Sequence, residues 1–388
     1  MEVKLWKIVC LVLITIFAFS VINIVHATSA LSPSTGPSIS GPMAYNSANG
    51  AIYILGDDGT VNVVSDTTNN VVTTVNTEIG ELAGHQLTYG QGEIFVSSGD
   101  AKAQGVPPTV TVISGSTNTV TAAITSSHWW FPVGMAYDSG TGNLYLADRG
   151  NLGNVFGTVY VISGSSNTVS TSILVGRYPQ QLCYDSGAHE IFVANSGGNI
   201  SVISDSNNQV VATIPVGTYP FGIVYDSKMN EVFVYNENDK TVSIISDSSN
   251  TVVKTITGVT GNTLNPINIA YDSNKNEIFA GYSVISDSTN TIVAQLPTTV
   301  TEVIYDSGRG EIFGSTSTGT TAVFSDSSSP SSSTTPTSTQ SAPATATTTP
   351  KVPEFSSVAL VSVAAVMVVV ASCTVALKTR KIKKTVLT

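Results

Sequence analysis

The chain has 388 residues, of which 41% are hydrophobic and 11% charged, with a formal net charge of −10 at pH 7. Residues 28–326 hold 8 basic and 24 acidic residues, which gives this segment a formal net charge of −16. So acidic a surface repels phosphate backbones, and we predict no nucleic-acid partner. The abundance of Val, Ile, Thr, Ser, Asn and Gly in the same segment predicts an all-β domain.

Residues 1–27 have the features of a secretory signal peptide. A charged start with Lys4 and Lys7 precedes an apolar block from Ile8 to Val25, and Val25-His26-Ala27 forms a small-residue cleavage site. The apolar block is longer than is usual for a signal peptide, so an uncleaved N-terminal anchor is the alternative. With either interpretation, we expect the following residues to lie outside the cell.

A tandem repeat of roughly 45 residues fills residues 42–326. Its marker is a tyrosine, followed in most units by Asp-Ser, and it occurs at Tyr45, Tyr89, Tyr137, Tyr184, Tyr225, Tyr271 and Tyr305. The clearest unit contains four short β-rich runs bounded by turn residues, beginning at Leu182. Four strands in each of seven units predict a seven-bladed β-propeller with four-stranded antiparallel blades.

Two turn motifs recur within the units. Asp-Ser-x-x-x-Glu lies between the first and second strands, and Asp-Ser-x-Asn lies between the third and fourth, as at Asp205 to Asn208. Asp forms Asx-turns and Asn tolerates positive φ, so we interpret both motifs as turn signals. A ring of cation sites is the alternative, although no calcium loop of the DxDxDG type is present. We predict no metal site.

The segments Ile191-Phe-Val-Ala-Asn, Val202-Ile-Ser-Asp and Ile214-Pro-Val-Gly-Thr-Tyr-Pro resemble the YVTN-type β-propeller repeat of prokaryotic surface-layer and exported proteins. The resemblance covers about residues 42–326 and implies a WD40-like disc at a cell surface, with ligands that differ among members. Two units depart from the pattern. The sixth has a shortened connection at Ala280-Gly281-Tyr282, and the seventh stops after Val323-Phe324-Ser325 without a fourth strand.

The seventh unit needs a fourth strand from elsewhere in the chain. Propellers usually close their ring with a strand from the opposite terminus, which removes an open sheet edge. Residues 28–41 are the candidate for this ring-closing strand, although Pro33 and Pro37 make the segment a poor strand former.

One face of the predicted disc collects aromatic and basic side chains. The loops between second and third strands and those between blades lie on the same face of such discs, and the longer segments of this sequence fall in them. The candidate recognition residues there are Trp129, Trp130, Phe131, Arg149, Arg177, Tyr178 and Tyr219. Aromatic and Arg side chains on rigidly held loops favour recognition of a cell-envelope glycan or protein partner. The alternative is that the tryptophans pack between blades and the arginines pair with acids.

Two further sequence features bear on this face and on catalysis. Asn199-Ile200-Ser201 is an N-glycosylation acceptor motif near the same face. His85, His128 and His189 fall in different repeats and different kinds of connection, which disfavours a three-histidine metal site, and no Ser-His-Asp elbow is recognisable. We predict no catalytic or cofactor-binding residue, and no disulfide for Cys183, which is the single cysteine of the β region.

The C-terminal segments predict a tethered protein. Residues 327–352 are rich in Ser, Thr and Pro, as in an extended, O-glycosylated stalk. Within 353–377, the uncharged run from Ser356 to Leu377 is about 33 Å long as a helix at about 1.5 Å per residue, enough to span a bilayer. The basic tail at 378–388 predicts a cytoplasmic C-terminus and an extracellular propeller.

The stalk, the Pro353-Glu354-Phe355 signature, the apolar run and the basic tail together resemble archaeal sorting tails that archaeosortase-type enzymes process. That resemblance implies exchange of the helix for a lipid anchor. The prediction from sequence is therefore a noncatalytic recognition, adhesion or envelope-structural module at the cell surface. The alternatives are an exported propeller enzyme or electron-transfer relative with an unidentified cofactor, and a solute-binding propeller.

Overall fold

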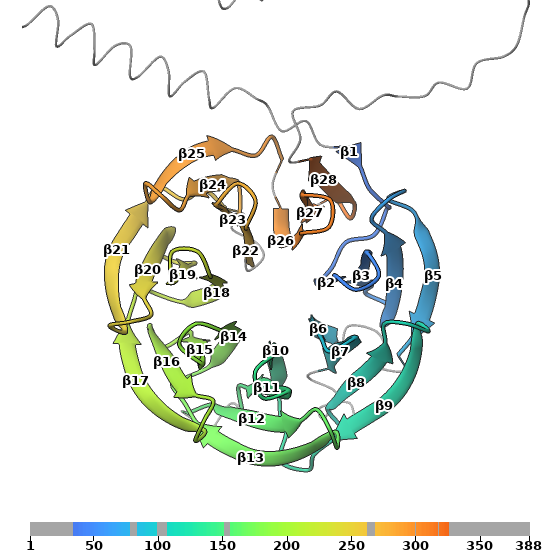
Figure 1. Ribbon diagram of the computed structural model, residues 1–388, viewed down its shortest axis with the longest axis horizontal. Coiled ribbons are helices and arrows are strands. Elements are labelled where there is room, and N and C mark those ends of the chain that lie inside the picture. The colour runs from blue at the N-terminus through green and yellow to red at the C-terminus, as the bar shows by residue number, and fades with distance from the viewer. Residues whose placement is uncertain are drawn as a thin grey trace, which may run out of the picture. The chain divides into compact units, whose positions relative to one another are not determined.

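The computed structural model describes residues 34–77, 84–98, 107–150, 156–261, 268–298, 300–316 and 318–325. These residues form 28 strands in seven four-stranded sheets, all within the compact unit Met1–Ser329. Figure 1 shows the sheets arranged as blades around a central channel, with the first strand of each blade innermost. The prediction of an all-β, seven-bladed propeller with antiparallel blades is confirmed.

The strands of each blade follow one another in the chain from the channel outward. Blade 1 contains β2 (Met43–Asn46), β3 (Ala51–Leu55), β4 (Thr60–Ser65) and β5 (Val71–Asn76); blade 2 contains β6 (Gly84–Gly90), β7 (Glu93–Ser98), β8 (Thr109–Ser114) and β9 (Thr119–Thr125); blade 3 contains β10 (Pro132–Asp138), β11 (Asn143–Asp148), β12 (Thr158–Ser163) and β13 (Thr168–Leu174). Blade 4 contains β14 (Pro179–Asp185), β15 (Glu190–Asn195), β16 (Asn199–Ser204) and β17 (Gln209–Pro215); blade 5 contains β18 (Pro220–Asp226), β19 (Glu231–Asn236), β20 (Thr241–Ser246) and β21 (Thr251–Thr257). Blade 6 contains β22 (Ile269–Asp272), β23 (Glu277–Ala280), β24 (Ser283–Ser286) and β25 (Thr291–Gln295); blade 7 contains β26 (Val300–Asp306), β27 (Glu311–Thr316) and β28 (Thr321–Ser325).

Blade 7 obtains its fourth strand from the N-terminal segment. Strand β1 (Ser34–Thr35) pairs antiparallel with β28, with Ser34 opposite Val323 and Thr35 opposite Ala322 (Figure 1). The backbone N–H of Thr321 donates to the carbonyl of Pro37 at 3.1 Å. Pro37 therefore fits this position, because only its carbonyl is needed.

Apolar side chains fill the seven junctions between blades. Each of seven buried clusters draws residues from two adjacent blades, and one of them joins blade 7 to blade 1. In β15, five of six residues are buried, whereas β17 at the outer edge is mostly exposed. The second strands are therefore packed on both faces, and apolar burial of this kind is the main stabilising term of such a ring.

The turn motifs form as the sequence predicts, with one difference. Asn208 has φ of 56°, in the left-handed region, and Asn250 and Asn290 follow the same rule. Asx-capping, however, occurs at the turn between first and second strands, where Asp185 Oδ1 accepts the N–H groups of Gly187 and Ala188 at 2.8 and 3.0 Å. The Asp205 carboxylate instead accepts a hydrogen bond from the Tyr184 hydroxyl at 3.4 Å.

The repeat tyrosines connect neighbouring blades. The Tyr225 hydroxyl of blade 5 lies close to the carboxylate of Asp185 in blade 4, and burial and this carboxylate raise the tyrosine pKa. Tyr271 makes the same contact with Asp226, and Tyr45 makes it with Asp306. The shortened connection of blade 6 is a two-residue hairpin, because Ala280 pairs directly with Ser283.

Several predicted segments lie outside the described residues. These are the signal peptide at 1–27, the stalk at 327–352, the sorting motif and transmembrane segment at 353–377, and the tail at 378–388. In the part of the chain that the structure describes, no helix has the length and apolar character needed to cross a membrane.

Candidate recognition face and central channel

The two adjacent tryptophans of the predicted face have different environments. Trp129 is 0% exposed and packs in the apolar cluster between blades 2 and 3, with its ring centroid 6.1 Å from that of Tyr160. Trp129 is therefore a core residue, in agreement with the alternative that the tryptophans pack between blades. Trp130 is 43% exposed.

A buried carboxylate holds the loop that carries these residues. Asp148, at the end of β11, accepts the backbone N–H of Trp130 at 2.7 Å and that of Phe131 at 2.9 Å. Its Oδ1 also accepts the N–H of Gly150 at 2.7 Å. These three hydrogen bonds fix the backbone of the loop next to Trp129.

Three of the predicted residues meet in one small pocket over blade 4. Its volume is about 180 Å³, and it is lined by Arg149, Tyr178, Gln180, Ser196 and Tyr219. Arg149 follows β11 of blade 3, Tyr178 and Tyr219 precede the inner strands of blades 4 and 5, and Ser196 follows β15. Loops from three blades therefore form a single site, which we call the Arg149 pocket.

The Arg149 guanidinium contacts neutral groups only. Its Nε donates to Gln180 Oε1 at 3.1 Å, its Nη2 donates to the same oxygen, and it stacks 5.4 Å from the Phe131 ring centroid. Burial lowers the pKa of Arg149, while the nearby Tyr219 raises it. Among the described residues, Arg149 has no carboxylate in an ion pair, since the salt bridges there are His189–Asp205 and Arg309–Glu311.

Tyr178 and Tyr219 share an uncommon backbone conformation. Their φ angles are 52° and 58°, in the left-handed region, which costs of order 1–3 kcal/mol for a residue other than glycine. The conformation is held by the backbone, because the Tyr178 carbonyl accepts the N–H of Ser196 at 3.0 Å and the Tyr219 carbonyl accepts that of Glu237 at 2.9 Å. Tyr178 presents a 42% exposed side chain at the pocket mouth.

Sequence reasoning missed Gln180 and Ser196. Gln180 Nε2 donates to Ser196 Oγ at 2.5 Å, so the two residues link the inner strand of blade 4 to its next loop. The pair Gln180-Gln181, which places two polar residues at the start of an inner strand, was the signal that could have indicated them.

Two further predicted residues lie outside the pocket. Arg177 is exposed and does not line it, and the half-buried Asn199 accepts a hydrogen bond from Asn195 at 3.0 Å.

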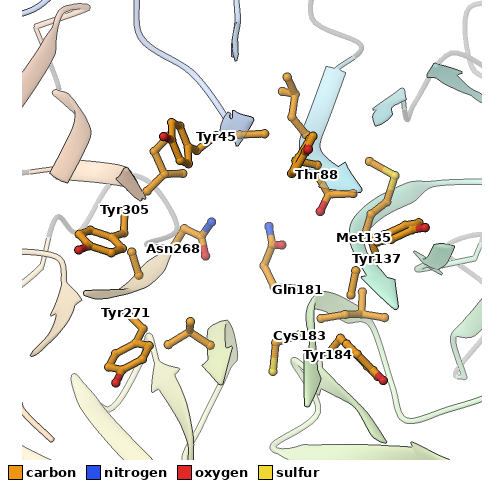
Figure 2. Close-up of a pocket in the computed structure, with 18 of the residues that line it drawn as sticks. Tyr45, Thr88, Met135, Tyr137, Gln181, Cys183, Tyr184, Asn268, Tyr271 and Tyr305 are labelled. Atoms are coloured by element: carbon orange, nitrogen blue, oxygen red, sulfur yellow. The ribbon is translucent and has the colours of Figure 1, made fainter. Parts of the chain in front are cut away.

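The central channel forms a second, larger cavity. Its volume is about 600 Å³, and it is lined by the inner strands of all seven blades. Figure 2 shows Gln181 and Asn268 pointing into it. Gln181 is 7% exposed, and in the described part of the chain its Oε1 accepts no hydrogen bond.

Two titratable groups lie at or near the channel wall. Asn268 Nδ2 donates to Glu302 Oε2 at 3.4 Å, and burial raises the pKa of Glu302 to about 7. Cys183 also lines the channel, and burial raises the pKa of its thiol. A thiol with a raised pKa is a poor nucleophile, because the thiolate is the reactive form.

Within the described ranges, no group of three or more His, Cys, Asp or Glu residues is arranged to hold a metal ion.

No protein-family model matches this sequence, and no curated protein is significantly similar to it. The resemblances to YVTN-type repeats and to archaeal sorting tails therefore have no independent support, and the functional argument depends on the geometry of the face.

Proposed function

We propose that this chain is a noncatalytic cell-surface propeller that recognises a cell-envelope glycan or protein partner through one face of its disc. The observation that carries the proposal is the Arg149 pocket, in which loops of three blades bring a guanidinium and two tyrosines together. Exposed Trp130 and Arg177 extend the same face. We call Trp130, Phe131, Arg149, Arg177, Tyr178 and Tyr219 the recognition face.

The composition of the pocket supports binding rather than catalysis. Its polar groups are Arg149, Gln180, Ser196 and two tyrosine hydroxyls. Nucleophilic catalysis needs a base within hydrogen-bond reach of the nucleophile. Within the described residues, the side-chain contact of the Ser196 hydroxyl is the Gln180 amide, which is not a base. Aromatic and Arg side chains on rigid loops supply the large contact area and directional hydrogen bonds that recognition requires.

The cellular setting in this proposal comes from the sequence. The signal-peptide features of 1–27 and the apolar run from Ser356 to Leu377, followed by a basic tail, favour export of the propeller and anchoring at the membrane. The Ser/Thr/Pro-rich segment at 327–352 then acts as a stalk. A propeller displayed in this way has its recognition face available to envelope components.

The test is binding of the full chain, purified in mild detergent, to isolated cell envelopes. The double variant Trp130→Ala/Tyr178→Ala removes two exposed aromatic side chains from the recognition face. Met229→Ala is the matched control, because Met229 is 41% exposed and lies in the turn between β18 and β19, on the opposite face. We expect the double variant to lose at least tenfold in affinity and the control to bind normally. Equal binding by all three proteins would contradict the proposal.

A second candidate function is binding of a small solute in the channel. The observation that favours it is the buried Gln181 side chain, whose Oε1 accepts no hydrogen bond within the described residues and which faces a cavity of about 600 Å³. Equilibrium dialysis against an extract of small molecules, with Gln181→Leu for comparison, tests this candidate. Retention of a solute by the parent chain and not by the variant would support it.

A further inference from the structure

The Arg149 pocket contains a cation without a counter-ion in the described structure. A partly buried charge is costly unless it is paired, and buried charged groups in proteins normally have a partner. The carboxylate of the preceding residue, Asp148, already accepts three backbone N–H groups. Gln180 offers Arg149 one neutral oxygen. The charge of Arg149 is therefore available to a ligand.

The guanidinium also has unused hydrogen-bonding capacity. An arginine carries five N–H donors in a planar fork that suits a carboxylate. In the described residues, Arg149 uses Nε and Nη2 on Gln180 Oε1, and Nη1 donates to no group. A carboxylate placed at the Nη1 side would gain charge-assisted hydrogen bonds without displacing Gln180.

The rest of the pocket suits a sugar ring. Tyr178, which lines the pocket, presents exposed aromatic surface, and Gln180 and Ser196 add neutral polar groups to the lining. The pocket volume of about 180 Å³ leaves room for one small ring. None of the five lining residues is acidic, so the pocket does not itself repel an anion.

We infer that the Arg149 pocket binds a carboxylate-bearing sugar, such as a uronic acid residue of an envelope glycan. Arg149 pairs with the carboxylate, and Tyr178 packs against the ring. This inference rests on the proposed function, because it names the ligand chemistry of the same pocket. The formal charge of −16 on residues 28–326 does not by itself prevent an acidic glycan from binding, because exposed charges more than about 8 Å from the site are largely screened at physiological salt.

The experiment measures binding of short glucuronate and galacturonate oligosaccharides to the full chain in mild detergent, at physiological ionic strength. The matched probes are the neutral glucose and galactose oligosaccharides of the same length, and a tetraglutamate peptide represents an acidic protein partner. The variants are Arg149→Gln and Arg149→Lys. Lys228→Gln is the control, because it removes the same charge from an exposed residue in the turn between β18 and β19, on the opposite face.

We expect at least one uronate probe to bind at least tenfold more tightly than its neutral counterpart and than tetraglutamate. Arg149→Gln should weaken that binding at least tenfold, since a charge-assisted hydrogen bond is lost. Arg149→Lys should give an intermediate affinity, because it keeps the charge but not the fork. Lys228→Gln should change affinity less than threefold. The inference is overturned if no uronate probe binds, if the neutral probes bind equally well, if tetraglutamate binds best, or if Arg149→Gln has no effect.

The two proposals fail in different ways. If Trp130→Ala/Tyr178→Ala still binds isolated envelopes, the recognition face itself is wrong. If that double variant loses envelope binding while Arg149→Gln retains it, recognition stands and the carboxylate ligand is wrong.

Discussion

The hydroxyl of Tyr45 in blade 1 lies close to the carboxylate of Asp306 in blade 7, so a polar side-chain contact joins the first and last blades of the ring. Asp306 Oδ1 also accepts the N–H groups of Gly308 and Arg309 at 2.8 and 3.2 Å. One carboxylate therefore caps the turn of its own blade and binds the next blade. Strand β1 completes the same blade at its opposite, outer edge by pairing with β28.

Tyr45→Phe should reduce stability and change its dependence on pH. Burial, and then Asp306, raise the Tyr45 pKa above its ordinary value near 10, so folding favours the protonated hydroxyl. The stabilising contribution is full below about pH 10 and is lost as the pH rises above that value. We expect Tyr45→Phe to cost about 0.5–1.5 kcal/mol near pH 7 and to lose less stability than the parent between pH 9 and 11.

Urea unfolding of both proteins across this pH range provides the measurement. Tyr178→Phe is the control, because Tyr178 is exposed and lies outside the blade junctions. An alkaline loss of stability that is identical in the parent and in Tyr45→Phe would count against a role for this hydroxyl.

Gly90→Asp should destabilise the ring, although five other units have Asp at this position. A Cβ at Gly90 would lie 2.1 Å from Cγ of the Tyr137 ring, and Tyr137 also stacks on Phe95 at 6.1 Å. Overpacking of this kind typically costs about 1–3 kcal/mol. Asn46→Asp at the equivalent position of blade 1 is the control and should be tolerated. Unfolding by urea measures both, and a Gly90→Asp variant as stable as the parent would show that Tyr137 moves freely.

Trp129→Ala should mainly reduce stability, whereas Trp130→Ala should mainly reduce binding to envelopes. Removing the buried Trp129 leaves a cavity between blades 2 and 3, which should cost about 3–5 kcal/mol. Trp130→Ala should change stability by less than about 1 kcal/mol, because its side chain is exposed, yet weaken binding to envelopes. Thermal unfolding and envelope binding of the two variants check this, and similar stability losses in both would contradict the assigned environments.

Glu302→Gln should flatten the pH dependence of stability between about pH 4.5 and 7. The pKa of Glu302 is raised to about 7 by burial, so the folded state holds its proton more tightly than the unfolded chain does. The stabilising contribution is complete below about pH 4.5 and is lost as the pH rises through 7. Melting temperatures of parent and variant across this range provide the test. If the parent instead gains stability relative to Glu302→Gln between pH 5 and 7, folding lowers the pKa of Glu302 and the prediction is wrong.

The architecture could be predicted because the repeat contains its own strand and turn signals. Tyr184 and Tyr225 mark the inner strands of blades 4 and 5, and Asn208 and Asn250 mark turns that need positive φ. These signals are local in the sequence, so they can be recognised without knowledge of tertiary contacts.

The details of the candidate site could not be predicted in this way, because they depend on contacts between blades. Trp129 and Trp130 are adjacent and chemically identical, yet Trp129 packs among residues of blades 2 and 3 whereas Trp130 is 43% exposed. Gln180 and Ser196 became part of the pocket only through tertiary proximity to Arg149. The sequence analysis named three of the five pocket residues, Arg149, Tyr178 and Tyr219, but it could not predict that they meet in one pocket with Gln180 and Ser196.

The most direct test of the account is hydrogen–deuterium exchange of the full chain with and without isolated envelope glycans. We predict slower exchange in the loops that carry Trp130, Tyr178 and Tyr219, with no change in the turn at Lys228 and Met229 on the opposite face. Protection confined to that opposite face, or none in the three loops at a glycan concentration that saturates binding, would contradict recognition through the Arg149 pocket.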